Sequence, residues 1–234
     1  MFGRKKIAML VAEFLGTGFL TLVFLAVQRS TIGVPYFVAL GAGLIVAALA
    51  VAVGNVSGAH FNPAITIGLW TTRKVKTFAA AAYIVVQLLG GWAAYGVYTY
   101  FVHSSLQPIG GHFTARIMIA EAVGMFIFAF LWAAIAAQRV VASWTGAAYA
   151  LGVIVAAAAS IGFINPAVAL GARAWDIWGT MGWAYVAGPL IGAIVGFNLY
   201  QIFFTDQYDS VTARISGGSS TRSTASKSAK SRKK

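Results

Sequence analysis

Long apolar segments separated by short polar ones make up most of the 234-residue chain. A helix needs about 20 residues to cross the hydrocarbon of a bilayer, and six segments meet or approach this length. They cover residues 7–27, 34–54, 78–102, 116–137, 145–161 and 180–204. Two further apolar stretches, 62–70 and 165–172, are too short to span and are typical of re-entrant half-helices. The pattern predicts an all-α polytopic membrane protein with six transmembrane helices and two half-helices.

Each short stretch begins with the same tripeptide. The copies are Asn62, Pro63 and Ala64 in SGAHFNPAIT, and Asn165, Pro166 and Ala167 in GFINPAVALG. Asn suits the N-cap of a helix and Pro its first turn. Non-helical backbone at this depth is tolerated only inside protein or beside a water-filled cavity. Two half-helices entering from opposite faces would bring their positive N-terminal ends together, a place that repels cations and offers amide donors to neutral solutes.

The second half of the chain repeats the first. AEFLGTGFLTLVF matches AEAVGMFIFAFLW, so that Glu13 corresponds to Glu121, and the two Asn-Pro-Ala segments follow in the same order. Repeat one covers 7–102 and repeat two covers 116–204. Each repeat holds three spans, an odd number, so the two halves cross the membrane in opposite directions. Inverted repeats of this kind occur in channels and in secondary transporters.

Composition and charge agree with a membrane location. Hydrophobic residues make up 59% of the chain and charged residues 9%, against about a quarter charged in soluble proteins. If both termini are cytoplasmic, the outside carries only Arg29, Arg116 and Arg173 of the 17 Lys and Arg residues, as the positive-inside rule requires. We therefore expect a cell-membrane protein with a basic cytoplasmic N-terminus (1–6), a channel domain (7–204) and a disordered, basic, Ser-rich cytoplasmic tail (205–234).

The same residues argue against several other functions. There is no Cys, and the three His and two intramembrane acids form no nucleophile–base pair, so we predict no enzyme, no cofactor and no metal site. The net charge is +12, but nucleic-acid binding is supported only by the basic tail, which carries seven of the 17 Lys and Arg residues. Two alternatives to a channel stay open. One is a secondary transporter that uses the intramembrane Glu residues, and the other is a closed-pore structural membrane protein.

The segments AEFLGT, SGAHFNPAIT and YIVVQLLGG, with the second Ala-Glu and the second Asn-Pro-Ala, together resemble the aquaporin (major intrinsic protein) family. The resemblance covers 7–204. It implies an aquaporin-like fold in the lipid bilayer, one pore per subunit of a homotetramer, and passive transport of water or small uncharged solutes of the glycerol, urea and ammonia class. It also implies that Glu13 and Glu121 accept hydrogen bonds from the half-helix loops. We interpret His60 as an orienting partner for the first of these loops rather than as a ligand.

The chain departs from the family at the outer constriction, the selectivity filter. An Arg usually follows the second Asn by three residues, and here that position is Val168. Alignment with the family assigns the other filter positions to Ala42, Gly162 and, on the fifth helix, Ala159. All four are small and apolar, so we predict a filter wider than a water-selective one. Arg173 is a candidate charge at the outer mouth, although pairing with Asp176 and exposure to solvent are alternatives.

Overall fold

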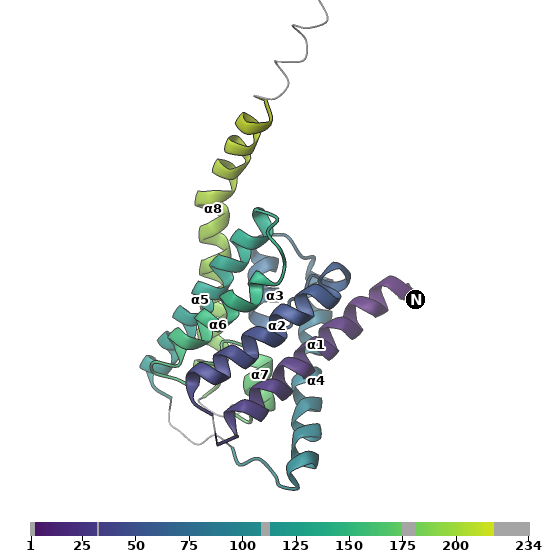
Figure 1. Ribbon diagram of the computed structural model, residues 1–234, viewed down its shortest axis with the longest axis vertical. Coiled ribbons are helices and arrows are strands. Elements are labelled where there is room, and N and C mark those ends of the chain that lie inside the picture. Colours follow the sequence, from purple (N-terminus) through teal and green to yellow (C-terminus); the bar gives the residue numbers. More distant parts are fainter. Residues whose placement is uncertain (1–2, 32, 109–112, 175–180, 218–234) are drawn as a thin grey trace, which may run out of the picture.

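The computed structural model describes residues 3–31, 33–108, 113–174 and 181–217, and it is a bundle of helices (Figure 1). The first half contains α1 (Arg4–Gln28), α2 (Pro35–Ser57), α3 (Pro63–Thr71) and α4 (Thr77–Val102). The second half contains α5 (Ala115–Ala137), α6 (Trp144–Ala156), α7 (Pro166–Gly171), a π-helical segment η1 (Trp183–Ala187) and α8 (Gly188–Gly217). The order of two helices, one short helix and another long helix therefore occurs twice.

The two short helices begin as their sequences predict. Asn62 is the N-cap of α3, and its side-chain oxygen accepts a hydrogen bond from the Ala64 backbone N–H at 2.8 Å. Asn165 caps α7 in the same way through the Ala167 backbone N–H at 3.0 Å. In each helix a Pro occupies the first turn, where its missing N–H costs no hydrogen bond. Figure 1 shows α3 and α7 among the longer helices.

Glycine contacts show the repeat in three dimensions. In the first half, Gly90 of α4 lies so close to α1 that a Cβ would collide with the Phe14 carbonyl oxygen. In the second half, Gly192 of α8 lies equally close to the Ala122 carbonyl oxygen of α5. These are equivalent positions in the two repeats. Small residues at such crossings let membrane helices approach closely, which is the main way in which helices gain packing energy in lipid.

One helix is shorter than predicted. Five helices in the described ranges are long and apolar enough to cross a membrane, whereas α6 has 13 residues and ends at Ala156. The sequence predicts a span to residue 161. After Ala156 the chain closes in a turn, in which the Ala158 and Ala159 backbone N–H groups donate to the Val155 and Ala156 carbonyl oxygens. The segment that follows is held from another helix, because the backbone N–H groups of 162–164 donate to Glu121 of α5.

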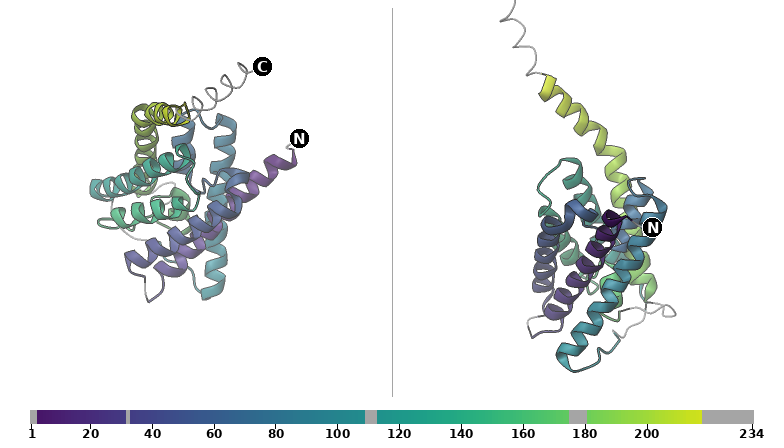
Figure 2. Two further views of the ribbon diagram at one scale, coloured as in Figure 1. Left: turned by 45° about the horizontal axis from the view of Figure 1, so that its top comes forward. Right: turned by 90° about the vertical axis from the view of Figure 1, so that its right-hand side faces the viewer.

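α8 continues as a helix to Gly217, past residue 205, where the sequence predicts the start of a disordered tail. Its last turns extend beyond the other helices (Figures 1 and 2). Residues 205–216 contain neither Gly nor Pro, so the helix has no residue at which to end before the glycine pair 217–218. The tail from 218 onward lies outside the described residues.

Candidate pore and its half-helices

The two Asn side chains of the repeated motif cross over to one another's loops. The Asn62 amide nitrogen donates to the Ile164 carbonyl oxygen at 2.9 Å, and the Asn165 amide nitrogen donates to the Phe61 carbonyl oxygen at 2.9 Å. Both Asn residues are buried. Each side chain therefore caps its own half-helix with its oxygen and fixes the opposite loop with its nitrogen, so that the first turns of α3 and α7 meet at this centre.

Glu13 of α1 holds the loop before α3. One carboxylate oxygen accepts from the His60 backbone N–H at 3.0 Å and the other from the Phe61 backbone N–H at 2.7 Å. The second oxygen also accepts from the Gln87 amide of α4 at 2.8 Å, and that amide reaches Thr66 of α3 at 3.0 Å. The carboxylate is fully buried but bonded on both oxygens, which offsets much of the cost of removing it from water.

Glu121 of α5 makes the equivalent contacts in the second repeat. It accepts hydrogen bonds from the backbone N–H groups of Gly162 and Phe163 at 3.1 and 3.0 Å, and from that of Ile164 at 2.6 Å. The Ser160 hydroxyl donates to the same carboxylate at 2.7 Å. Two buried acids thus organise the two loops through matching backbone contacts.

His60 connects the first loop to α3 and to two aromatic rings. Its Nδ1 lies 3.1 Å from the Thr66 hydroxyl, and its ring centroid lies 5.1 Å from that of Tyr83. The Tyr83 hydroxyl donates to the Ser57 carbonyl oxygen at 2.8 Å, at the end of α2. The other ring against His60 is Trp132 of α5, with centroids 6.4 Å apart. His60 therefore lies in a position that fits the predicted orienting role.

Two of the predicted filter residues lie on the elements expected for them. Ala42 lies on α2, Val168 lies in the first turn of α7, and both are fully buried. Beside them, the Phe163 ring packs 5.1 Å from Phe24 and 5.1 Å from Tyr185, centroid to centroid. Sequence reasoning missed these aromatic residues. Because these rings pack nearby, small filter side chains do not by themselves create open space. The predicted width of the selectivity filter stays a prediction.

The assignment of Ala159 to the fifth spanning helix is wrong. α6 ends at Ala156, and Ala159 lies in the turn that follows. The residue of α6 that approaches Gly162 is Val153, whose carbonyl oxygen would lie 2.7 Å from a Cβ at Gly162 and whose side chain is fully buried. Gly162 also has a φ of 76°, which favours glycine. The physical cause is the early end of α6, which closes in a turn where the Ala159 backbone N–H donates to the Ala156 carbonyl oxygen.

Arg173 lies just after α7 and contacts another segment. Its guanidinium nitrogen is 3.5 Å from the Leu106 carbonyl oxygen, and the guanidinium carbon lies 5.8 Å from the centre of the Tyr95 ring. Asp176, its predicted alternative partner, lies outside the described residues. The contacts connect the end of α7 to α4 and to the segment after it, and a role for Arg173 at the outer mouth stays a prediction.

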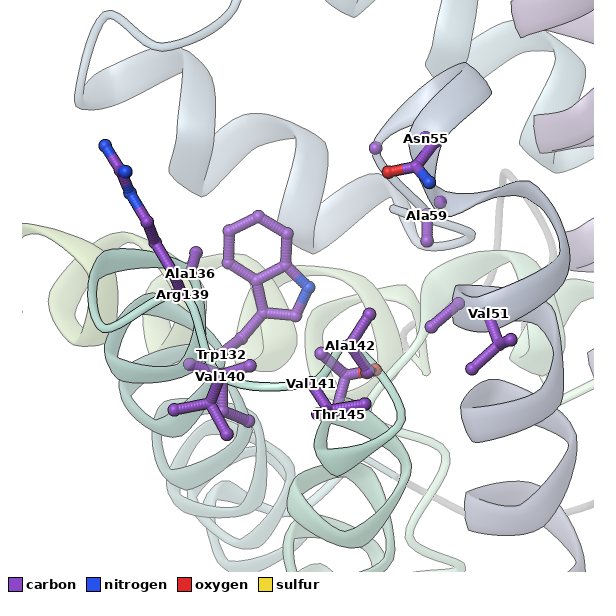
Figure 3. A pocket seen from close by; sticks show the side chains of 14 residues that line it. Val51, Asn55, Ala59, Trp132, Ala136, Arg139, Val140, Val141, Ala142 and Thr145 are labelled. Carbon is purple, nitrogen blue, oxygen red and sulfur yellow. The ribbon is translucent and has the colours of Figure 1, made fainter.

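A cavity that sequence reasoning did not anticipate opens at the other end of the bundle. It has a volume of about 450 Å³ and lies among the C-terminal ends of α2 and α5 and the N-terminal end of α6. Figure 3 shows the Trp132 indole projecting into it from α5, with Ala59 and Asn55 across the cavity and Arg139 at its edge. Ala59 directly precedes His60, so the cavity reaches the loop that leads to Asn62.

Residues 4–200 match the family described as major intrinsic protein. The chain belongs to this family. Among curated major intrinsic proteins it is 31% identical over 224 residues to nodulin-26 of Glycine max, with 88% of this chain and 81% of that protein covered. It is 32% identical over 186 residues to aquaporin AqpM of Methanothermobacter marburgensis, with 70% and 75% covered.

The fold is also that of a solved major intrinsic protein. The chain superposes on the aquaglyceroporin of Plasmodium falciparum with a TM-score of 0.69 and 19% sequence identity, covering 87% of this chain and 99% of that one. Members of the family are membrane channels rather than enzymes. The protein is therefore a multi-pass membrane protein and a passive channel for water and small solutes.

Proposed function

We propose that this major intrinsic protein conducts small uncharged solutes of the glycerol, urea and ammonia class as well as water. The observation that carries the proposal is the reciprocal pair of hydrogen bonds between Asn62 and Asn165 and the opposite loops. Each bond uses one of the two amide hydrogens, and a solute would compete for the second with a neighbouring side chain, which for Asn165 is the Tyr149 hydroxyl. For Asn62 the competing partner is the Met125 sulfur at 3.9 Å, a weak acceptor. Amide donors beside the first turns of two helices favour a neutral hydrogen-bonding molecule and oppose a cation.

The outer constriction supports solutes other than water. Val168 replaces the cationic side chain that the resemblance implies at this position, and Ala42 and Gly162 add neither charge nor a side-chain donor. Hydrogen-bond groups and electrostatic barriers lining a pore decide what passes it. The solved relative with the same fold is named an aquaglyceroporin, which supports the same solute class.

The contacts of the two buried acids weaken the transporter alternative. Glu13 and Glu121 were its only support, and each holds a half-helix loop through backbone N–H groups. A carboxylate that cycled between protonated and charged forms during transport would release these donors and loosen the loop. We therefore assign both acids a structural role in supporting the loops, together with His60.

We infer that the protein lies in the cell membrane with both termini in the cytoplasm and forms a homotetramer. The charge distribution along the chain supports the orientation. Large apolar side chains such as Leu44 and Val51 are exposed on the long helices, as expected of faces that contact lipid or another subunit.

Stopped-flow light scattering of proteoliposomes tests the proposal. Wild-type protein is expected to speed osmotic shrinkage by water and re-swelling by urea or glycerol relative to empty liposomes. Water permeation with strict exclusion of both solutes would contradict the predicted solute range. No increase for water or for any small solute would favour the closed-pore structural alternative, with which the burial of Asn62, Asn165, Ala42 and Val168 is compatible.

A further inference from the structure

Trp132 lines the cavity at the α2–α5–α6 end of the bundle. Its indole lines that cavity together with Ala59, and it also lines a second cavity of about 170 Å³ beside Phe197. The next residues along the loop are His60, which is 8% exposed, and Asn62, which is 1% exposed. Accessible space thus narrows sharply between the indole and the Asn pair.

Neighbouring rings hold the indole in place. Its ring meets Phe197 of α8 edge-on, with centroids 5.4 Å apart and planes at 71°. On the loop side it meets His60 edge-on, with planes at 85°. Two perpendicular contacts on different elements restrict rotation of the ring, so its bulk stays at one position.

A solute that travels from the cavity toward Asn62 passes this ring. Figure 3 shows the indole directed from α5 toward the loop of Ala59, with its nitrogen facing the middle of the cavity. The indole N–H has no hydrogen-bond partner among the described residues. One side of the passage is therefore a large flat ring with a single donor, whereas the outer filter residues Ala42, Gly162 and Val168 carry small side chains.

We propose that Trp132 is a specificity-determining residue that sets the upper size of the transported solute at the inner end of the pore. The inference rests on the proposed function, because it assumes that solutes cross between this cavity and the Asn pair. The solute class it admits is small, uncharged and hydrogen-bonding. Water accepts one hydrogen bond from the indole N–H and passes the ring. A branched or longer polyol is too large and collides with the ring.

The test compares glycerol and water permeability of proteoliposomes that contain wild type, W132A or W132F. Size discrimination at an apolar site is worth about 10- to 200-fold. W132A is expected to raise glycerol permeability at least about tenfold while water permeability changes less than about threefold. W132F keeps a flat ring and is expected to keep the wild-type preference for small solutes.

W144A is the matched control, because Trp144 at the start of α6 is 59% exposed and lines no part of the Trp132 cavity. If W132A does not yield folded protein by size-exclusion chromatography, W132L replaces it. If the wild type conducts, an unchanged glycerol-to-water permeability ratio in the folded variant overturns the inference. A wild type without any permeability contradicts the proposed function instead, and glycerol flux in W132A alone would then still support the role of Trp132.

Discussion

The side chains that organise the centre of the molecule bind backbone atoms rather than one another. Asn62 and Asn165 each bridge two loops, while Glu13 and Glu121 each collect the N–H groups of one loop. These residues were predictable because polar groups stand out in apolar segments and occur twice. Trp132 was not, because one more aromatic residue in a membrane helix carries no signal in the sequence.

The Glu121 carboxylate is expected to be essential for the second loop. Glu121→Gln replaces one of two acceptor oxygens by a donor, which then faces either the Ile164 N–H or the N–H groups of Gly162 and Phe163. Each buried donor left without a partner costs about 1–3 kcal/mol, so the melting temperature of the purified protein should fall clearly. Ser160→Ala removes one donor and should cost less. Equal melting temperatures for E121Q and wild type would contradict the structural role of the acid.

Val168 is the residue at which the predicted filter is most directly tested. Val168→Arg places a long cation at a fully buried position of α7, where it should obstruct solutes and favour water. Glycerol permeability in proteoliposomes is expected to fall about tenfold or more. Val168→Leu is the control for size without charge. If V168R leaves glycerol flux unchanged, Val168 does not lie at the constriction.

At the scale of elements, the sequence located the helices better than their ends. The apolar runs predicted α1, α2, α4 and α5 to within a few residues, because a span must be about 20 residues long. The end of α6 falls inside an apolar run, where a turn at 157–160 is followed by backbone that donates to Glu121 on another helix, and no local pattern reports this. The same error moved the filter assignment to Ala159 when Val153 is the α6 residue beside Gly162.

The crossing of α1 and α4 gives a prediction at this scale. Gly90→Ala adds a Cβ that would collide with the Phe14 carbonyl oxygen, so the two helices must separate. Overpacking of this kind costs about 1–3 kcal/mol. Gly96→Ala on the same helix is the matched control, because a Cβ there meets nothing within 4 Å. Unfolding by denaturing detergent should occur at a lower detergent concentration for G90A than for G96A. The reverse order would contradict the close contact between α1 and α4.

Across the whole molecule, the contacts that form the candidate pore come from a single chain. The Asn bridges and the contact between the Trp132 and His60 rings join the two halves of one bundle. Each loop-binding acid acts within its own half. The apolar exterior supports assembly in lipid, and both Asn bridges lie within one chain. If each chain holds its own pore, flux through one subunit does not depend on its neighbours.

If the protein is a tetramer, as we propose, its subunits should conduct independently. Light scattering of the purified protein, corrected for detergent, should give about four times the chain mass of 24.6 kDa. Wild type and V168R, the variant expected to have low glycerol permeability, would then be refolded together at several ratios and reconstituted. With independent pores, an equal mixture keeps about half of the wild-type glycerol flux, because closed symmetric oligomers mix subunits without changing each site.

A pore on the fourfold axis, built by all subunits together, predicts a different dependence of glycerol flux on the V168R fraction. If one V168R subunit blocked the whole assembly, an equal mixture would keep only about one sixteenth of the flux, the chance that four randomly mixed subunits are all wild type. A linear decline with the V168R fraction therefore supports a pore inside each chain, as the bonds between the Asn62 and Asn165 loops require. A steep decline would place the conducting path between subunits and contradict the site derived from this single chain.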